Sequence, residues 1–261
     1  MDFIEFDAKE RKTEWSMSDL QSHSYWELYF LLDGKRRFFL KDRIYDINAI
    51  TVCVIPPFCM HKTEGGGYKR ININVSPDLL DEDEEKMLLS LGRTVVFTLD
   101  AKKSELIIEL LKKGADDSTA ENSDTPRESF LHVILHLIKN DGLLPYQHAD
   151  IVSSNEKDAL ILNVASYIHE HYMDDFSISD LCQIFYISKN TLCSRFMRVM
   201  NCSVMEYRQK VRINEAKELL VSTRLGVKEI AEKCGFSGAN YFSLIFKREV
   251  GISPLNYRKS K

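Results

Sequence analysis

The chain has 261 residues, of which 44% are hydrophobic and 28% are charged, and its formal net charge is -4. This composition provides material for the cores of about two domains, so a disordered chain is not expected. Charge is unevenly distributed: residues 1–154 carry 19 Lys and Arg against 27 Asp and Glu, whereas Ser177 to the end carries 15 against 7, which favours phosphate contact there.

The amino-terminal residues carry no secretory or membrane signal. Residues 1–12 contain several acids and no apolar core of secretory length, and the longest apolar runs are far shorter than a membrane span. The cysteines form no C-x-x-C pair, so we expect neither a zinc site nor a disulfide framework. They are Cys53, Cys59, Cys182, Cys193, Cys202 and Cys234. We therefore expect a cytoplasmic protein without a membrane partner.

The front of the chain is rich in strand-forming segments. Four β-rich runs between residues 25 and 75 read YWELYFLL, RRFFL, AITVCVI and YKRININV. Turn signals separate them at Asp33-Gly34, at Pro56-Pro57 and at the glycines of 65–67. The pattern predicts a small antiparallel barrel or sandwich within residues 1–77.

Helices are expected next, at 79–91, 101–113 and 126–140, the last opened by Thr125 and Pro126. The third helix has an apolar stripe formed by Phe130, Ile134, Leu137 and Ile138. Such a stripe needs a partner. Two partners remain open at this point: the same β domain, or another copy of the chain.

A polar, turn-prone stretch from Asp141 to Asn155 separates the two halves of the chain. We place the front domain at 1–145, with its β unit at about 1–77 and its helices at about 78–140. The linker is expected at 146–156 and an all-helical domain at 157–261. The predicted fold class is α+β multidomain.

The last third of the chain contains a sequence repeat. The segments FMRVMNCSVMEYR and FKREVGISPLNYR begin at Phe196 and Phe246 and align Asn201 with Gly251, two residues suited to ending a helix. Each unit reads as a short helix, a tight turn and a second helix, the helix-turn-helix pattern that places a helix in the DNA major groove. Helix starts are predicted at Ser177 with Asp180, at Ser203 with Glu206, and at Ser253 before Pro254.

Two recognition helices are predicted, at 189–200 and 238–250. Their buried faces are expected to contain Leu192, Phe196 and Val199 in the first, and Phe242, Ile245 and Phe246 in the second. The candidate DNA-contacting residues are Asn190, Cys193, Ser194, Met197, Arg198, Ala239, Asn240, Ser243, Leu244, Lys247 and Arg248. The alternative is that these residues form the solvated face of a helical bundle.

These residue types suit different parts of DNA. Asn190 and Asn240 can each make a bidentate contact to adenine, serines bond several base edges, and Leu244 can meet a thymine methyl. Arg198, Lys247 and Arg248 are better placed for phosphates. A helix from Val204 to Ser222 would span about 28 Å, close to the roughly 34 Å of one DNA turn. One chain could therefore read two successive major grooves.

The run AEKCGFS from Ala231, followed by Tyr241-Phe242, Phe246-Lys247-Arg248, Gly251-Ile-Ser-Pro and Tyr257-Arg258, resembles the signature of the AraC/XylS family of bacterial transcriptional regulators. The resemblance covers residues 157–260 and departs from the family at Asn201, usually Gly, and Cys182, usually Ala. It implies a seven-helix domain whose two helix-turn-helix units read double-stranded promoter DNA. It also implies a homodimer, allows RNA polymerase as a partner, and favours activation over repression.

The resemblance further implies a cupin-like jelly-roll sensor at the front. His23, Glu27 and Gly34 match H-x3-E-x6-G of the first cupin motif, and His61 with Pro56 fits part of the second. Those motifs are associated with a divalent metal, but Gln21 takes the place of the first histidine and leaves the ligand set incomplete. We therefore expect no metal and no cofactor.

A barrel interior is a natural cavity for a small ligand. The candidate effector-binding residues are His23, Trp26, Glu27, Tyr29, Phe39, His61 and Arg70. The sequence predicts a regulator without enzymatic activity that responds to a small molecule, by family habit a sugar or related metabolite. Two alternatives remain: a metal-dependent cupin enzyme with an appended DNA-binding domain, and a constitutive DNA-binding protein whose front half only dimerises.

Overall fold

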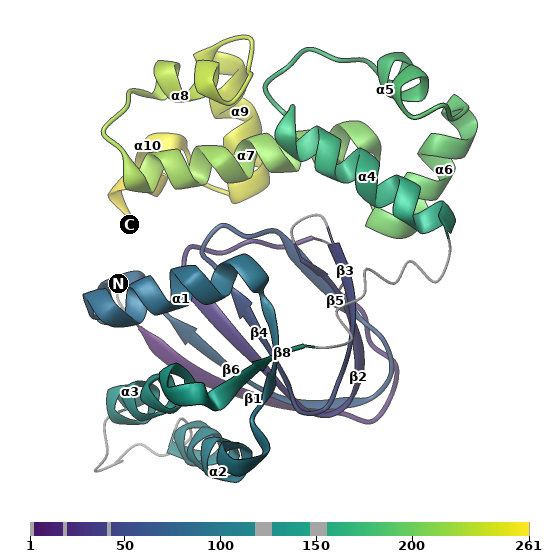
Figure 1. The fold of residues 1–261 in the computed structure, drawn as a ribbon. Helices are drawn as coiled ribbons and strands as arrows, with labels where there is room; N and C mark the ends of the chain where they lie inside the picture. Colours follow the sequence, from purple (N-terminus) through teal and green to yellow (C-terminus); the bar gives the residue numbers. More distant parts are fainter. Residues whose placement is uncertain (1–2, 18–19, 41–42, 118–126, 147–155, 261) are drawn as a thin grey trace.

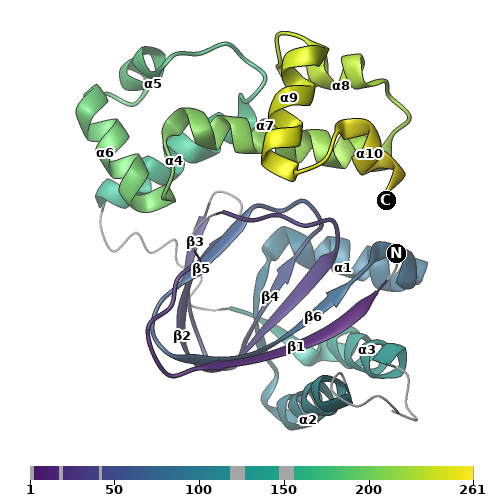
Figure 2. The same ribbon diagram turned by 180° about the vertical axis from the view of Figure 1, so that it is seen from behind.

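The computed structural model describes residues 3–17, 20–40, 43–117, 127–146 and 156–260. A rolled antiparallel sheet with helices α1–α3 forms the front half, and helices α4–α10 form the second half over one end of the barrel (Figures 1 and 2). The strands are β1 (Ile4–Arg11), β2 (Trp26–Leu40), β3 (Arg43–Asn48), β4 (Thr51–Ile55), β5 (His61–Glu64), β6 (Tyr68–Val75), β7 (Val96–Leu99) and β8 (Leu143–Pro145). The predicted α+β architecture is confirmed.

Strand β2 joins the two parts of the barrel. The main strand order is β1-β6-β2-β4-β7-β8, and β3 and β5 both pair with β2. The first half of β2 pairs with β4 and β6, and the second half pairs with β3 and β5. Because successive residues of a strand face opposite sides, the first half of β2 supplies both an outer core and the barrel interior.

The predicted turn at Asp33-Gly34 is wrong. The chain continues as a single strand through a bulge, where the register against β6 shifts between Leu31 and Asp33. Gly34 has φ +91°, and a Cβ there would lie 2.3 Å from the carbonyl oxygen of Gly67. The glycine therefore permits a close approach of two strands, and does not mark a reversal of the chain.

Three helices belong to the front half: α1 (Glu82–Thr94), α2 (Ala101–Asp117) and α3 (Arg127–Leu137). The first begins later than predicted because Pro77–Leu79 forms a separate 3-10 turn, and Asp81 caps α1 in a reciprocal capping box with Glu84. The third helix continues into a π-helical turn, Ile138–Gly142.

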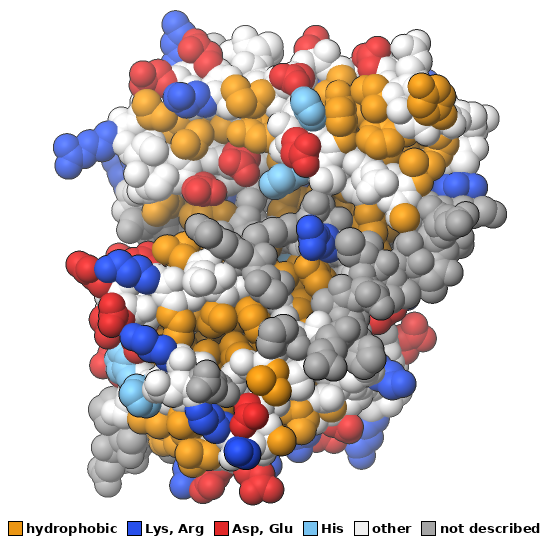
Figure 3. Space-filling view, in the orientation of Figure 1, with side chains coloured by type: hydrophobic (Ala, Val, Ile, Leu, Met, Phe, Trp, Pro, Cys, Tyr) orange, Lys and Arg blue, Asp and Glu red, His pale blue; other side chains and the backbone are white. Residues whose placement is uncertain are grey.

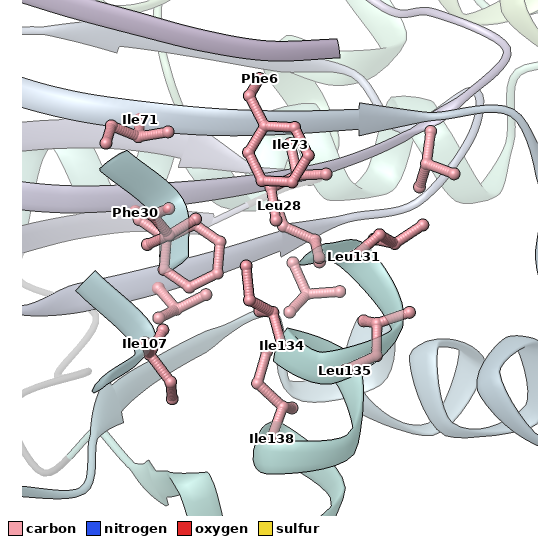
Figure 4. Packing of buried hydrophobic residues seen from close by; sticks show 14 of the residues in the cluster. Phe6, Leu28, Phe30, Ile71, Ile73, Ile107, Leu131, Ile134, Leu135 and Ile138 are labelled. Carbon is pink, nitrogen blue, oxygen red and sulfur yellow. The ribbon is translucent and has the colours of Figure 1, made fainter. Parts of the chain in front are cut away.

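The apolar stripe of α3 packs against the sheet of its own chain. Ile134 and Ile138 belong to a buried cluster that also contains Phe30 and Ile73 from the sheet and Ile107 from α2 (Figure 4). Of the two partners left open by the sequence, the β domain is therefore the one this stripe contacts.

The first part of the polar stretch that starts at Asp141 belongs to the front domain. Residues Leu143–Pro145 form β8, which pairs with β7 and so belongs to the front domain. The central part of the expected linker, residues 147–155, lies outside the described residues.

The described second half contains seven helices, as predicted. They are α4 (Glu156–Glu170), α5 (Ile178–Ile184), α6 (Lys189–Met200), α7 (Val204–Ser222), α8 (Val227–Lys233), α9 (Ala239–Val250) and α10 (Pro254–Lys259). The capping boxes at Ser177 and Ser203 are present, and Ser253 caps α10 with Pro254 in its first turn. Helices α6 and α7 have the predicted bounds, and α9 begins after Gly238.

The sequence repeat corresponds to a repeat of contacts. Phe196 meets Tyr207 with ring centroids 5.5 Å apart, and Phe246 meets Tyr257 at 5.5 Å, both edge to face. Asn201 ends α6 and Gly251 ends α9, both in the left-handed conformation that the sequence predicts. The repeated residues therefore encode the same second-helix packing twice.

Candidate DNA-binding surface and effector cavity

Helices α6 and α9 each bury one face and expose the other. The side chains of Leu192 and Phe196 in α6, and of Phe242, Ile245 and Phe246 in α9, are buried, whereas Val199 is half-buried. On the opposite faces Met197 is 46% exposed and Leu244 is 68% exposed. The predicted helical register is thus confirmed, because an error in register would have buried these two residues.

The other predicted contact residues follow the same pattern. Asn190, Ser194 and Arg198 of α6 are exposed, as are Asn240, Lys247 and Arg248 of α9. Cys193, Ala239 and Ser243 are half-buried at the edges of these faces. The exposed amides can meet base edges, and the cationic side chains can meet phosphates.

Basic and acidic side chains are mixed on one face of the second half. On the face shown in Figure 3, Lys and Arg side chains alternate with Asp and Glu over both halves. Arg248 itself lies beside Glu249, with an Nη2–Oε1 distance of 2.9 Å. The net positive charge of this half therefore does not produce a uniformly cationic surface in that view.

Two arginines of the repeat have structural roles. Arg208 of α7 is 5% exposed, donates to the carbonyl oxygens of Tyr172 and Phe176 at 3.4 and 3.1 Å, and also donates to that of Asp174. Arg258 of α10 donates to the carbonyl oxygens of Leu220 and Leu225 at 3.0 and 2.6 Å. These are matched positions in the two units, and each guanidinium holds the loop that precedes the first helix of its unit.

Sequence reasoning missed Tyr186 in the turn between α5 and α6. Its side chain is 97% exposed and its backbone has φ +50°. The repeat could have drawn attention to it, because the matching turn of the second unit contains Gly235, also at positive φ. An exposed phenol beside a recognition helix is suited to a phosphate contact.

The barrel encloses a cavity of about 330 Å³. Five of the seven predicted effector-binding residues line it: His23, Glu27, Tyr29, His61 and Arg70. The volume and the mixture of aromatic and polar walls suit a small polar ligand.

Trp26 and Phe39 do not line this cavity, and their assignment is corrected. Trp26 alternates with Glu27 along β2 and so faces the outer core against the helices. Phe39 lies beyond the bulge, where Phe38 faces inward and Phe39 joins a cluster with the second half of the chain. The missed bulge between Leu31 and Asp33 explains the error at Phe39, because it changes which residues of β2 face inward.

Strand β6 supplies a row of polar cavity residues that sequence reasoning largely missed. Tyr68, Arg70, Asn72 and Asn74 line the cavity, whereas the intervening isoleucines face the core. The alternation in YKRININV carried this signal, but only Arg70 was selected from it. The remaining unpredicted wall residues include Asp7, Trp15, Met17, Gln21, Tyr25, Phe38 and Thr63.

Three ionisable side chains meet at one side of the cavity. His23 Nε2 lies 2.9 Å from Glu27 Oε2, and His61 Nε2 lies 3.4 Å from the same oxygen. Burial lowers the pKa of His61 and so favours the neutral ring. Burial alone would raise the pKa of Glu27, but the hydrogen bond with His23 and nearby positive charges outweigh it, so the carboxylate is ionised.

Several buried polar atoms in the cavity wall have no hydrogen-bond partner among the residues that the structure describes. They are the hydroxyl of Tyr29 and the side-chain oxygens of Asn72 and Asn74. Each of these residues is less than 9% exposed. Burial raises the pKa of Tyr29, so its hydroxyl retains a proton to donate. Because unpaired buried polar atoms are unfavourable, the wall is suited to a ligand with several hydrogen-bonding groups.

The barrel rim contacts helix α7. The side chain of Asn214 donates to the carbonyl oxygen of Phe58, and the Phe58 amide donates to the carbonyl oxygen of His23 at 2.6 Å. A cleft of about 390 Å³ lies between the halves, and Gln21, His23 and Tyr25 line both this cleft and the barrel cavity. The rim therefore connects the cavity wall directly to α7.

Models of known protein families match both halves of the chain. A family model described as an AraC-like ligand binding domain matches residues 4–135, and one described as a helix-turn-helix domain matches residues 181–260. The chain belongs to the AraC family. It is therefore a transcriptional regulator with a ligand-binding domain and a DNA-binding helix-turn-helix domain.

Relatives extend over most of this AraC-family chain. The uncharacterized HTH-type transcriptional regulator YfiF of Bacillus subtilis (strain 168) is 28% identical over 92% of this chain and 78% of its own length. The HTH-type transcriptional activator RhaR of Mannheimia succiniciproducens is 24% identical over 92% and 86%, respectively.

Among solved structures, the DNA-binding domain of AdpA in complex with a target DNA is 27% identical over 38% of this chain and 90% of that chain. Its TM-score is 0.37. No helix in the described ranges of this AraC-family regulator is long and apolar enough to cross a bilayer.

Proposed function

We propose that this regulator binds a small polar effector in the barrel cavity and transmits its presence through α7 to two DNA-reading helices. The observation that carries the proposal is the position of α7. This helix lies between the two helix-turn-helix units, and through Asn214 it also bonds the rim residue Phe58. An effector that shifts the rim would change the position or freedom of α7.

The effector must bind the two arrangements with different affinities in order to act as a switch. A coupling of about 1–3 kcal/mol gives a useful change in DNA occupancy. His23 is the connecting residue, because its side chain lines the cavity and its carbonyl oxygen accepts from Phe58, whose own carbonyl accepts from α7.

On DNA, Asn190 and Asn240 are proposed to read adenine, with Ser194, Met197, Ser243 and Leu244 at neighbouring bases. Arg198, Lys247 and Arg248 are proposed to contact phosphates, and Cys193 and Ala239 to lie at the edges of the interface. The exposure of these helix faces supports the assignment.

The proposal also covers properties that membership of the family does not specify. We propose domains at 1–145 and 157–261, a cytoplasmic homodimer that activates transcription with RNA polymerase, and no enzymatic activity. The relative RhaR is named as an activator, which supports that sign of regulation. A sugar or related metabolite is the proposed effector, supported by the polar cavity wall.

The test of DNA reading begins with an operator selected from random-sequence DNA by the full-length protein. Asn240→Ala should weaken operator binding by about 1–3 kcal/mol and leave random-sequence DNA unaffected. Arg248→Ala should weaken both and reduce the slope of log affinity against log salt by about one. Lys86→Ala, which removes an exposed charge from α1, serves as the control.

Equal losses on operator and random DNA for Asn240→Ala would contradict base reading by α9. A salt slope that Arg248→Ala leaves unchanged would contradict the phosphate assignment. Both measurements are made without an effector, so they test the DNA surface separately from the cavity.

A further inference from the structure

The hydrophobic cores of the two helix-turn-helix units are separate, although both include part of α7. Among the described residues, the cluster of the first unit reaches Val211 on α7, the cluster of the second unit begins at Ile213, and no side chain belongs to both. Long helices bend. Two cores that share a helix and no side chain can therefore change their mutual angle, unless contacts away from the helix axis hold them.

Arg212 lies between those two positions of α7 and contacts the first unit through the loop that precedes α5. Its Nε donates to the carbonyl oxygen of Tyr172 at 2.6 Å, and its Nη2 donates to those of Met173 and Asp174, both at 3.4 Å. The side chain of Tyr172 packs against the cluster of the first unit. One guanidinium thus holds three consecutive carbonyl groups of the first unit.

The same guanidinium contacts the second unit. Arg212 Cζ lies 5.8 Å from the ring centroid of Phe236, a distance at which a cation is attracted to an aromatic ring. Phe236 is 7% exposed and belongs to the turn between α8 and α9. Its ring lies 5.1 Å from that of Phe242 and 6.3 Å from that of Tyr241, both in α9. Arg212 therefore connects the first unit to the residues that support the second recognition helix.

Gly235 allows the turn of the second unit to approach the loop of the first. A Cβ at this position would lie 2.8 Å from the carbonyl oxygen of Met173 and 2.8 Å from Arg212 Nη2. Any larger residue would have to displace the backbone of the loop. The loop, the turn and the guanidinium thus meet at one point, on one side of α7.

The neighbours of Arg212 on α7 make different contacts. Arg208, one helical turn earlier, donates to the carbonyl oxygens of the same loop and lies 4.3 Å from the ring centroid of Phe176, all within the first unit. Gln209 donates to Glu249 of α9 at 3.0 Å, but this hydrogen bond is exposed and water competes for both partners. The contacts of Arg212 are therefore the better-protected link between the units.

We infer that Arg212 sets the angle between the two helix-turn-helix units and so determines which spacing of operator half-sites the regulator accepts. Each added base pair moves the second half-site by about 3.4 Å and rotates it by about 34° around the duplex. Two readers held at one angle accept one spacing, whereas two readers that move independently accept several. The inference rests on the proposed reading of DNA by α6 and α9, and it adds a positioning residue that lies outside the DNA surface.

The test compares the operator selected by the full-length protein with versions that have one or two base pairs inserted or deleted between the half-sites. The wild type should lose at least about tenfold in affinity at two base pairs, because one unit then loses its base contacts. Arg212→Met keeps side-chain bulk against Phe236 and removes the donors to the loop. In this variant the second unit can follow its half-site and keep its base contacts, so the loss should fall below about threefold.

Gly235→Ala interrupts the same link from the other side and should flatten the spacing profile in the same way. Each variant has a matched control. Arg258→Met removes a guanidinium that bonds the carbonyl oxygens of Leu220 and Leu225, which belong to the second unit. Gly251→Ala introduces left-handed backbone strain where no atom lies near the added methyl group. Both controls should lower stability and keep the wild-type spacing profile.

Circular dichroism melting identifies the variants that are folded at the temperature of the binding assay. An unchanged spacing profile in either folded variant, Arg212→Met or Gly235→Ala, would overturn the inference. A wild type without a spacing preference would also overturn it, as would controls that flatten the profile equally. In each of these cases operator binding by the wild type leaves the regulator function standing, whereas failure of the wild type to select any operator would contradict the proposed function itself.

Discussion

The two helix-turn-helix units have matching interiors and different surroundings. The first unit shares its hydrophobic cluster with Leu20, Phe39, Ile44 and Met60 of the sensor domain. Within the described part of the chain, the cluster of the second unit contains only residues between 213 and 257. Repeated residues thus encode the fold of each unit, whereas unrepeated residues determine that the sensor contacts the first unit and not the core of the second.

The turns within the two units also share a backbone conformation and differ in their surroundings. Gly235 has φ +73°, and a Cβ there would lie 2.8 Å from the carbonyl oxygen of Met173. Tyr186 adopts φ +50° at the matching place, yet its side chain is almost wholly exposed. The second turn therefore requires glycine for space as well as for conformation, and the first does not.

The largest expected effects come from the paired core rings. Phe196→Ala and Phe246→Ala should each lower the free energy of unfolding by about 3–5 kcal/mol, because each removes a fully buried ring beside a tyrosine. Urea denaturation followed by circular dichroism measures both. Losses that differ by more than about 2 kcal/mol would contradict the equivalence of the two interiors.

Replacing the matched arginines, Arg208 and Arg258, should lower the free energy of unfolding by different amounts. Arg208→Ala removes a buried guanidinium that donates to three carbonyl oxygens, two of which keep a bond from Arg212, and should cost about 2–3 kcal/mol of unfolding free energy. Arg258→Ala, with two acceptors and greater exposure, should cost about 1–2 kcal/mol. The same denaturation experiment gives both values, and a larger loss at Arg258 would reverse the predicted order.

The contact between the sensor domain and α7 should matter both for stability and for the response to an effector. Asn214→Ala removes the donor to Phe58 and should lower the unfolding free energy by about 1 kcal/mol. It should also reduce any change in operator affinity that an effector produces. Glu218→Ala, an exposed change on the same helix, is the control. An unaltered effector response in Asn214→Ala would argue against transmission through this contact.

The smallest effects are expected where the recognition helices end. Gly251→Ala should destabilise by about 1 kcal/mol, because φ is +89° and no atom lies near the added Cβ, so that only backbone strain contributes. Asn201→Gly, at φ +56°, should stabilise by up to about 1 kcal/mol. Thermal melting of both variants tests the pair, and shifts of the same sign would contradict the interpretation.

The helical half could be predicted nearly to the residue, whereas the barrel could not. Apolar spacing and caps at Ser177, Ser203 and Ser253 define the helices locally, so α6 and α7 were located with the correct bounds. In the barrel, the bulge at Asp33 and the short strands β3, β5, β7 and β8 depend on pairing with residues distant in the chain. Local sequence contains little information about such pairing.

The candidate sites show the same division. Exposure of Asn240 and Leu244 followed from helical periodicity, which fixes the buried face once Phe242 and Phe246 are placed. In the cavity, Trp26 was wrongly included with Glu27 and Tyr29 because strand alternation gives two faces and does not say which one is enclosed.

The sequence by itself determined the family, the repeated helix-turn-helix units and the faces these helices expose, because 3.6-residue periodicity and capping act within a few residues. Only the tertiary structure decided that His23, Glu27 and His61 meet, that Asn72 and Asn74 line the same cavity, and that Asn214 bonds the barrel rim. Apart from His23 and Glu27, which are neighbours at i,i+4, those contacts join residues 34 to 156 positions apart, and the pairing of strands and the packing of domains bring them together.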